Sequence, residues 1–266
     1  MPARWPFAKY HGLGNDFLVG PDSRGFDAGR AQRLCARHTG VGADGVMLVS
    51  SRRGRHAVRI FNADGSEATF SGNGIRCAAA YLFAAGVASP LELATPAGPV
   101  RVERLRGVSM RLSFAIDALR RPGDPPVRSV ALPAGLGKSF WRAFHVVLGN
   151  PHLILPVDDA ERLEPGAAEA LDRARGSSRR FPGGINVSLV APISRDSFRL
   201  RTWERGVGLS PSCASGACAA LLAGVTARFL PSAVRFVQDG GTVGVRTGDG
   251  QMSLEGPIEL AFTGEA

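Results

Sequence analysis

The sequence predicts a mixed α/β (α+β) protein built from two similar halves, and three observations lead to this prediction. Strand-like segments alternate along the chain with two short alanine-rich helical segments, as in mixed α/β proteins. Both helical segments begin with small residues, one after Ser71 and the other after Cys213. A Gly-Asn step precedes each of them at a similar distance, at Asn15 and at Asn150. These repeated features favour an internal duplication.

The length and composition agree with two domains. A chain of 266 residues, 44% hydrophobic and 21% charged, can bury a sizeable core and is long enough for two modest domains. We predict a first domain over residues 1–117 and a second over 118–266, with a last strand that can cross to the first half. The arginine- and proline-rich segment ALRRPGDPPVRS (118–129) is the natural linker.

Five segments rich in β-branched and aromatic residues are predicted strands. In chain order they are AVRIFNA (57–63), PVRVERL (99–105), SMRLSF (109–114), INVSLVAPI (185–193) and SFRLRTW (197–203). The two helical segments are GIRCAAAYLFAAG (74–86) and GACAALLAGVTARFL (216–230). Since both helices are apolar on nearly every side, we expect them to be buried.

The two helix starts form the candidate binding site. A helix N-terminus offers unpaired N–H groups and partial positive charge, so two of them across one cleft would hold a carboxylate without a metal. Gly72, Gly74 and Gly216 would let the backbone approach such a ligand, and Asn73 and Ser215 add side-chain donors. Taken alone, an SGNG motif is more often an ordinary turn and helix cap.

The composition argues against several other classes of function. The formal net charge is +9, but its arginines are scattered over the whole chain, so we expect no nucleic-acid partner. No apolar run is long enough for a signal peptide or a membrane span, so we expect no membrane contact and a cytoplasmic location. The four cysteines include no CxxC pair and are predicted to be reduced thiols, and no histidine spacing indicates a metal site.

Seven segments, taken in order, carry a resemblance to a known family. They are KYHGLGNDF (9–17), GVGADG (40–45), FNADGSEA (61–68), SGNGIRC (71–77), LGNPH (148–152), INVSLV (185–190), and ERGVG (204–208) followed by SCASGACAA (212–220). The chain thereby resembles the diaminopimelate epimerases, cofactor-independent enzymes that invert one α-carbon of a diamino dicarboxylic acid. The resemblance implies two halves that each wrap a curved sheet around a central helix, an active site in the cleft between them, no cofactor and a homodimer.

The resemblance makes Cys213 an acid/base residue. An amino-acid α-proton is very weakly acidic, so an enzyme without a cofactor must stabilise the developing carbanion electrostatically and serve both faces of the carbon. We expect the helix N-terminus to lower the pKa of the Cys213 thiol, so that its thiolate acts as a base. His152 and Glu204 match the family residues that tune this thiol and hold the amino group.

Ser71 stands where the family has its first catalytic cysteine, and it is a candidate catalytic residue by that position. Serine is a strong helix N-cap, and an isolated hydroxyl is far harder to ionise than a thiol. Cys77 lies about one and a half turns into the helix, where we expect a buried core thiol that cannot replace Ser71.

The resemblance also implies a set of substrate-binding residues for a small amino-acid substrate. Arg205 offers a bidentate guanidinium to the distal carboxylate, and Glu204 adds negative charge for an ammonium group. Ala214 and Ser215 replace the glycine and threonine usual in the family, but backbone and hydroxyl donors remain. The matching asparagines are Asn15, Asn62, Asn150 and Asn186.

Three functions agree with these residues. The first is a diaminopimelate epimerase that interconverts the LL and meso forms at one α-carbon, for lysine and peptidoglycan synthesis, at a rate that Ser71 impairs. The second is a related amino-acid racemase, or a Ser/Cys dehydratase, with another substrate. The third is a catalytically silent paralogue that binds an amino acid or a protein partner. Exchange of the α-proton in deuterated water separates them.

Overall fold

The computed structural model describes residues 4–120, 127–130, 142–159, 184–204 and 208–266. The chain divides into two compact units, each with its own set of paired strands, called its sheet below, and a buried helix. Unit 1 comprises Met1–Ala118 with Ser253–Ala266, and unit 2 comprises Leu119–Met252. Both units combine many strands with few helices, which confirms the predicted α+β class. Among the described residues, no helix is long and apolar enough to cross a membrane.

The sheet of unit 1 follows from its strand pairing. In order across the sheet, the strands are β18, β1, β2, β3, β4, β6, β7 and β8, and β5 is a second neighbour of β4. Among these pairs of described strands, β2–β3 and β4–β6 are parallel and the others are antiparallel. The bounds are β1 Pro6–Gly12, β2 Asn15–Pro21, β3 Gly45–Arg52, β4 Arg55–Asn62, β5 Glu67–Ala68, β6 Leu91–Thr95, β7 Gly98–Arg104, β8 Ser109–Ala115 and β18 Glu259–Glu265.

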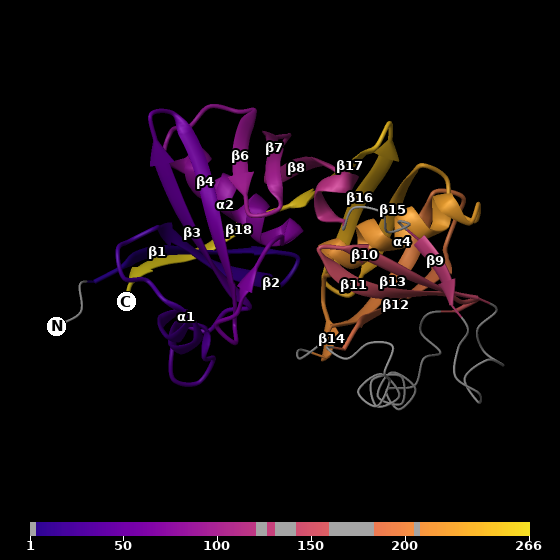
Figure 1. Ribbon diagram of the computed structural model, residues 1–266, viewed down its shortest axis with the longest axis horizontal. Helices are drawn as coiled ribbons and strands as arrows, with labels where there is room; N and C mark the ends of the chain where they lie inside the picture. The colour runs from indigo at the N-terminus through magenta and orange to yellow at the C-terminus, as the bar shows by residue number, and fades with distance from the viewer. Residues whose placement is uncertain (1–3, 121–126, 131–141, 160–183, 205–207) are drawn as a thin grey trace. The chain divides into compact units, whose positions relative to one another are not determined.

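Helix α2 (Gly72–Ala84) is the central helix of unit 1. It contacts β1, β2, β3, β4 and β8, and the sheet bends around it (Figure 1). Nearly all of its side chains are buried, as its apolar composition predicts. Since the strand period is two, Met47 of β3 approaches α2, whereas Val46 and Leu48 point to the other face.

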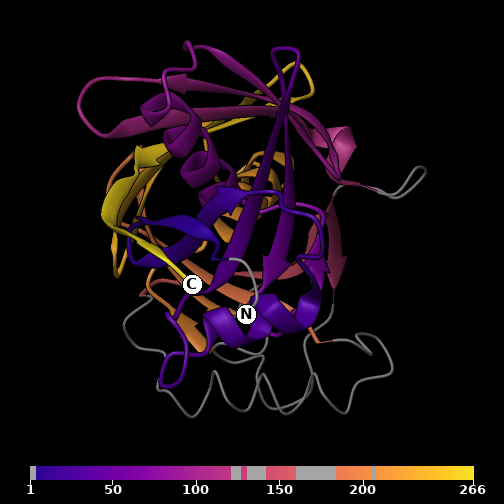
Figure 2. The ribbon, with the colours of Figure 1, turned by 90° about the vertical axis from the view of Figure 1, so that its left-hand side faces the viewer.

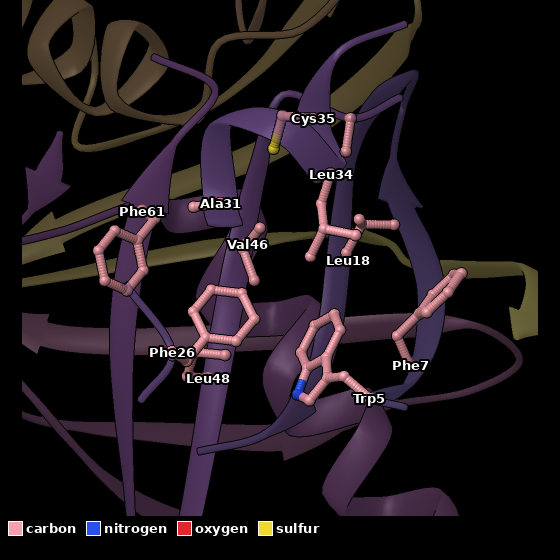
Figure 3. Close-up of a cluster of buried hydrophobic side chains, with 11 residues drawn as sticks. Trp5, Phe7, Leu18, Phe26, Ala31, Leu34, Cys35, Val46, Leu48 and Phe61 are labelled. Atoms are coloured by element: carbon pink, nitrogen blue, oxygen red, sulfur yellow. The ribbon is translucent and has the colours of Figure 1, made fainter. Parts of the chain in front are cut away.

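That other face is closed by α1 (Ala28–Cys35) and by aromatic side chains, as Figure 3 shows. Trp5 and Phe26 pack with ring centroids 5.0 Å apart, and Phe26 also contacts Phe61. Because both faces of β3 are covered, its first five residues are all buried. A strand buried on both sides loses the polar alternation of a surface strand.

The C-terminal strand β18 belongs to unit 1 although it follows unit 2 in the sequence. It pairs antiparallel with β1, and Figure 2 shows the yellow β18 beside the indigo β1. Trp5 and Ala266 exchange backbone hydrogen bonds of 2.7 and 3.0 Å at the end of this ladder. The strand before it, β17 (Gln251–Pro257), pairs with β8.

The sheet of unit 2 has the order β9, β10, β11, β12, β13, β15 and β16, with β14 as a second neighbour of β13. Helix α4 contacts β9, β10, β11, β12, β15 and β16. The bounds are β9 Val127–Val130, β10 Ala143–Leu148, β11 Asn150–Pro156, β12 Asn186–Pro192, β13 Ser197–Glu204, β14 Gly208–Ser210, α4 Ala214–Thr226, β15 Ala233–Gln238 and β16 Gly241–Gly248.

The two sheets repeat the same pairing, strand for strand. The hairpin β1–β2 corresponds to β10–β11, the parallel pair β2–β3 to β11–β12, and the antiparallel pair β3–β4 to β12–β13. Besides that partner, the last of these strands has one further antiparallel neighbour and one parallel neighbour in each unit, namely β5 and β6 or β14 and β15. The predicted internal duplication is therefore confirmed.

The predicted linker differs from the observed chain path. The two units meet in sequence at Ala118 and Leu119, within the short 3-10 helix Ile116–Leu119. Residues 121–126 lie outside the described residues. Val127, Arg128 and Ser129, which we had placed in the linker, form most of β9 and pair with β10. This part of the prediction is wrong, because a short strand with polar neighbours has too weak a sequence pattern to recognise.

Candidate active site

Helix α2 begins at Ser71, its N-cap residue. The backbone of Ser71 is extended (φ −147°, ψ 112°), and its hydroxyl oxygen accepts the Gly74 N–H at 3.2 Å. This bond satisfies one of the N–H groups that a helix start leaves unpaired. Within unit 1, no imidazole or carboxylate hydrogen-bonds to this hydroxyl, so the described surroundings of Ser71 contain no base that would activate it.

Helix α4 begins at Cys213 with the same geometry. Its backbone is extended (φ −117°, ψ 102°), and its sulfur accepts the Gly216 N–H at 3.3 Å. The Cys213 N–H donates to Gln238 Oε1 at 2.8 Å, and Ser215 Oγ lies 3.5 Å from the sulfur. The thiol is thus held by the first turn of its own helix and by the end of β15.

The charge state predicted for Cys213 is corrected by the structure. Burial raises the pKa of the Cys213 thiol well above its usual value, and the nearby Glu204 carboxylate raises this pKa further. The bonds from Ser215 and from the Gly216 N–H lower the pKa but do not offset these effects. The helix start therefore does not make a free thiolate here, and Cys213 stands as a thiol beside a carboxylate.

Two glycines at the helix starts lie in tight packing. A Cβ at Gly216 would lie 2.9 Å from Thr202 Oγ1, and 3.1 Å from both Cys213 Sγ and Ser188 Oγ. A Cβ at Gly74 would lie 2.7 Å from Met47 Sδ and 3.1 Å from Ser71 Oγ. We had expected these glycines to admit a ligand. In the structure they let each helix start approach the sheet beneath it and the capping side chain.

The polar side chains of unit 1 are linked in a chain. Asn15, the first residue of β2, donates from Nδ2 to Asp44 Oδ2 at 2.7 Å. Its Oδ1 accepts from Asn73 Nδ2 at 3.0 Å, and Asn73 Oδ1 accepts from Arg76 Nη2 at 2.5 Å. The structure thus joins two of the predicted binding residues, Asn15 and Asn73.

A compact group of charges supports this chain. Arg37 donates to Asp16 at 2.9 Å and to Asp44 at 2.6 Å, and Lys9 lies 2.9 Å from Asp16. The Asp16 carboxylate also accepts the Asp44 N–H at 3.0 Å. The bonds from Arg37 and Lys9 outweigh burial and hold the pKa of Asp16 below its usual value.

His152 and Asn186 are neighbours in unit 2. They face each other in the parallel pair β11–β12, and both are buried. Burial, with a smaller contribution from His145, lowers the pKa of His152 to about 3. In the described part of the chain, neither ring nitrogen of His152 has a hydrogen-bond partner. A neutral imidazole with two unsatisfied nitrogens is available to a ligand or to a moving proton.

The other predicted residues lie at strand and helix ends. Asn62 ends β4, is exposed, and donates to Ser66 Oγ at 2.9 Å within its own turn. Asn150 begins β11 and is exposed, and Gly72 and Ala214 are the first residues of α2 and α4. No contact that the structure gives brings Asn62 to the other candidates in unit 1. Arg205 lies outside the described residues.

The sequence interpretation missed three polar residues of these helix starts: Arg76, Asp44 and Gln238. Arg76 is a charged residue inside an otherwise apolar helical segment, and a fully buried charge requires partners. That signal could have identified it. Asp44 lies in the quoted GVGADG segment, and Gln238 ends an apolar strand. Only the folded structure shows what these two contact.

The remaining cysteines agree with the prediction of core thiols. All four cysteines are described and buried, and none of them forms a disulfide bond. Burial raises the pKa of Cys77 to about 12, and burial followed by Asp16 and Asp44 raises the pKa of Cys35 to about 12. Neither thiol ionises near neutral pH, so Cys77 does not replace Ser71.

Sequence comparisons identify relatives over almost the whole chain. The family model described as "Diaminopimelate epimerase" matches residues 7–107 and 144–259. A protein of Pelotomaculum thermopropionicum named "Diaminopimelate epimerase" is 34% identical over 97% of this chain and 98% of its own length. A protein of Acidiphilium cryptum with the same name is 35% identical over 100% of this chain and 97% of its own.

Solved structures share the fold. A phenazine biosynthesis PhzF family protein of Enterococcus faecalis matches with a TM-score of 0.73 at 17% identity, covering 99% of both chains. A predicted epimerase of Pseudomonas aeruginosa matches with a TM-score of 0.70 at 18% identity, over 98% of this chain and 99% of that one. Together with the sequence relatives, these findings show that the chain is an isomerase and belongs to the diaminopimelate epimerase family.

Proposed function

We propose that this protein is a diaminopimelate epimerase that interconverts the LL and meso forms at one α-carbon, without a cofactor, for lysine and peptidoglycan synthesis. The observation that carries the proposal is the matched pair of helix starts. Ser71 and Cys213 cap their helices with the same backbone conformation and the same hydrogen bond to the third residue after them. Full-length similarity to proteins named diaminopimelate epimerase supports the substrate.

The thiol of Cys213 serves one face of the α-carbon. When the carbanion is protonated, Cys213 gives its proton to carbon and becomes a thiolate, which the Gly216 N–H and the Ser215 hydroxyl stabilise. In the reverse direction the thiolate must form first. An ammonium group of the substrate beside Glu204 would offset the carboxylate charge and so lower the raised pKa of Cys213.

The opposite face needs a second acid and base, and Ser71 occupies the position where the family has a cysteine. A serine hydroxyl without a base is a poor proton acceptor. Because one transition state serves both directions, a poor base slows inversion both ways and leaves the equilibrium unchanged. Each ~1.4 kcal/mol added to that barrier costs a factor of ten in rate.

The test is proton exchange in deuterated water. We expect one isomer of diaminopimelate to exchange its α-proton faster than it inverts, measured by NMR for exchange and by chiral chromatography for inversion. Replacing Cys213 by alanine should abolish the exchange. The matched control is Cys218→Ala, which removes a buried thiol of the same helix five residues further on and should leave the exchange rate unchanged.

Other outcomes select the other functions. Inversion that keeps pace with exchange would mean that Ser71 or another group is a competent base, which contradicts the one-base mechanism. Exchange with a different amino acid, and none with diaminopimelate, would favour a related racemase. Ser71 is the observation that keeps this second candidate open, because it departs from the family pattern at a catalytic position.

A further inference from the structure

Four residues of unit 1 form a continuous hydrogen-bonded chain that begins and ends with a charge. The order is Asp44, Asn15, Asn73 and Arg76, with donor–acceptor distances of 2.7, 3.0 and 2.5 Å. At one end Asp44 is a carboxylate, which only accepts when ionised. At the other end Arg76 is a guanidinium, which only donates.

These two ends fix the direction of both amides between them. If the Asn15 amide were turned over, its oxygen would face the Asp44 oxygen at about hydrogen-bond distance, and two acceptors repel each other. If the Asn73 amide were turned over, its NH₂ group would face the Arg76 guanidinium, and two donors repel each other. Because the series of hydrogen bonds has an acceptor at one end and a donor at the other, both amides have only one orientation that satisfies every bond.

Both ends are themselves held in place. Asp44 receives Arg37 at 2.6 Å on one oxygen and the Asp16 N–H at 3.1 Å on the other. Arg76 is fully buried and its Nε donates to the Gly72 carbonyl at 3.3 Å. A buried guanidinium bonded within its own helix has little freedom to move away from Asn73.

Of the two side-chain amides, only that of Asn15 is accessible to solvent. Asn73 is 2% exposed, whereas Asn15 is half-buried at the start of β2. An asparagine NH₂ group has two hydrogens, and the bond to Asp44 uses one of them. The Asn15 oxygen is already engaged by Asn73, so the group that remains for a ligand is the second N–H.

The described positions of unit 2 that match this hydrogen-bonded chain carry other residue types. In the matching strands and helix, Asn150 corresponds to Asn15, but Ile185 stands in the place of Asp44 and Cys218 in the place of Arg76. An apolar residue and a thiol cannot fix the direction of an amide. The hydrogen-bonded chain therefore belongs to the unit that carries Ser71, and the duplicated fold does not require it.

We propose that Asp44 and Arg76 are positioning residues that fix the direction of the Asn15 and Asn73 amides, so that Asn15 presents an N–H, and not its oxygen, to an anionic group of the substrate. The identity of that substrate rests on the proposed function. A fixed donor favours a carboxylate and disfavours an ammonium group at the same place, which gives this contact its specificity.

The first test needs neither a substrate nor a variant of the chain. In the ¹⁵N,¹³C-labelled protein, a scalar coupling across the hydrogen bond should connect Asn15 Nδ2 with the carboxyl carbon of Asp44. We expect this coupling, and one strongly downfield Asn15 amide proton, in the unliganded protein. If the coupling is absent while the protein is folded, the amide direction is not fixed by Asp44 and the proposal is overturned.

The second test uses paired variants. Asp44→Asn puts an NH₂ group against Asn15 or Arg37, and Arg76→Met removes the donor end at similar volume. For each, we expect KM for diaminopimelate in the exchange reaction to rise about tenfold with kcat changed less than about twofold. The matched controls are Asp22→Asn, which makes the same charge change at a residue that faces Arg59 and has no bond to the chain, and Arg76→Lys, which keeps a donor-only end.

We expect KM within about threefold of the wild-type value in both controls. An unchanged KM in both Asp44→Asn and Arg76→Met would overturn the proposal, and so would equal losses in variants and controls, which indicate a merely structural role. If the protein exchanges no amino acid at all, the proposed function fails, whereas the coupling between Asn15 and Asp44 still decides the amide direction.

Discussion

The starts of α2 and α4 share a backbone conformation and a capping bond, yet their surroundings differ in kind. Pairing register matches Phe17 and Gly45 of unit 1 with His152 and Asn186 of unit 2. On the next strand of unit 1, Asn62 pairs with Gly45. On the next strand of unit 2, Trp203 pairs with Val187, so the following residue, Glu204, stands at the position that matches Asn62. Unit 2 therefore carries an imidazole and a carboxylate at positions where unit 1 has Phe17 and Asn62, and Glu204 acts on the Cys213 thiol.

Unit 1 has instead a set of groups whose charge and direction are fixed. Its chain from Asp44 to Arg76 consists of hydrogen bonds in which the Asp44 carboxylate only accepts and the Arg76 guanidinium only donates. Ser71 caps its helix, and no described imidazole or carboxylate of unit 1 hydrogen-bonds to its hydroxyl. The two units thus share one scaffold, and under the proposed function unit 2 would move protons while unit 1 would hold a ligand.

The largest expected effect comes from making the two helix starts alike. Ser71→Cys places a second thiol in the same capping geometry, and we expect inversion of diaminopimelate to accelerate by about a hundredfold or more, because a thiol is a far better acid and base than a hydroxyl. Chiral chromatography of the product measures the gain.

Ser71→Ala is the control for this change, since it removes the hydroxyl without adding a thiol and should give no acceleration. If Ser71→Cys inverts no amino acid faster than the parent protein, then the position is not catalytic and a silent paralogue is favoured.

The next effect is the loss of folding stability at acid pH, which we expect from His152 in unit 2 but not from Phe17, the residue at the matching position in unit 1. The pKa of His152 is about 3 in the folded protein and near 6.5 in the unfolded chain, so the unfolded chain binds more protons between these values. The free energy of unfolding should therefore fall as the pH drops from 6.5 towards 3. The contribution of this one group is about 1.4 kcal/mol per pH unit in the middle of that window.

His152→Phe introduces the residue of the matching position in unit 1 and should remove this contribution. Urea unfolding at a series of pH values measures the slope. A slope that is equally steep in the variant would show that His152 is not buried in its neutral form.

The smallest expected effect is a difference in folding stability between alanine substitutions at the two glycines of the helix starts. Gly216→Ala should lower the free energy of unfolding by about 1–3 kcal/mol, because the new Cβ meets the branched Thr202 side chain and the Cys213 sulfur. Gly74→Ala should cost less, since the nearest atom is the sulfur of the flexible Met47 side chain. Denaturant unfolding of both variants compares them, and a larger loss for Gly74→Ala would contradict the packing argument.

Much of the fold followed from local patterns. The strand predicted over residues 57–63 is β4 at Arg55–Asn62, and the one over 197–203 is β13 at Ser197–Glu204. The helices begin two residues earlier than predicted, because the capping residues Ser71 and Cys213 set their starts. The duplication was visible because the same small residues recur where each helix meets its sheet. The cleft between the halves stays a prediction.

The site was less predictable than the fold. Motif matches indicated Cys213, His152, Glu204 and the asparagines. The structure places most of these residues at a strand or helix end, whereas His152 is the third residue of β11. The sign of the Cys213 pKa shift was wrong, because a helix start alone lowers this pKa, but burial and Glu204 act more strongly in the opposite direction. Burial and neighbouring charge depend on residues distant in sequence, so spacing cannot reveal them.

By itself the sequence determined the α+β class, the repeated halves and the residues that begin the two buried helices. These features depend on periodicity and on capping, which act over a few neighbouring residues. Only the tertiary structure decided that Cys213 is a thiol beside Glu204, and that Asn15 is joined through Asn73 to Arg76. Asn15 and Asn73 are far apart along the chain, and a hydrogen bond between them exists only once β2 and α2 pack together.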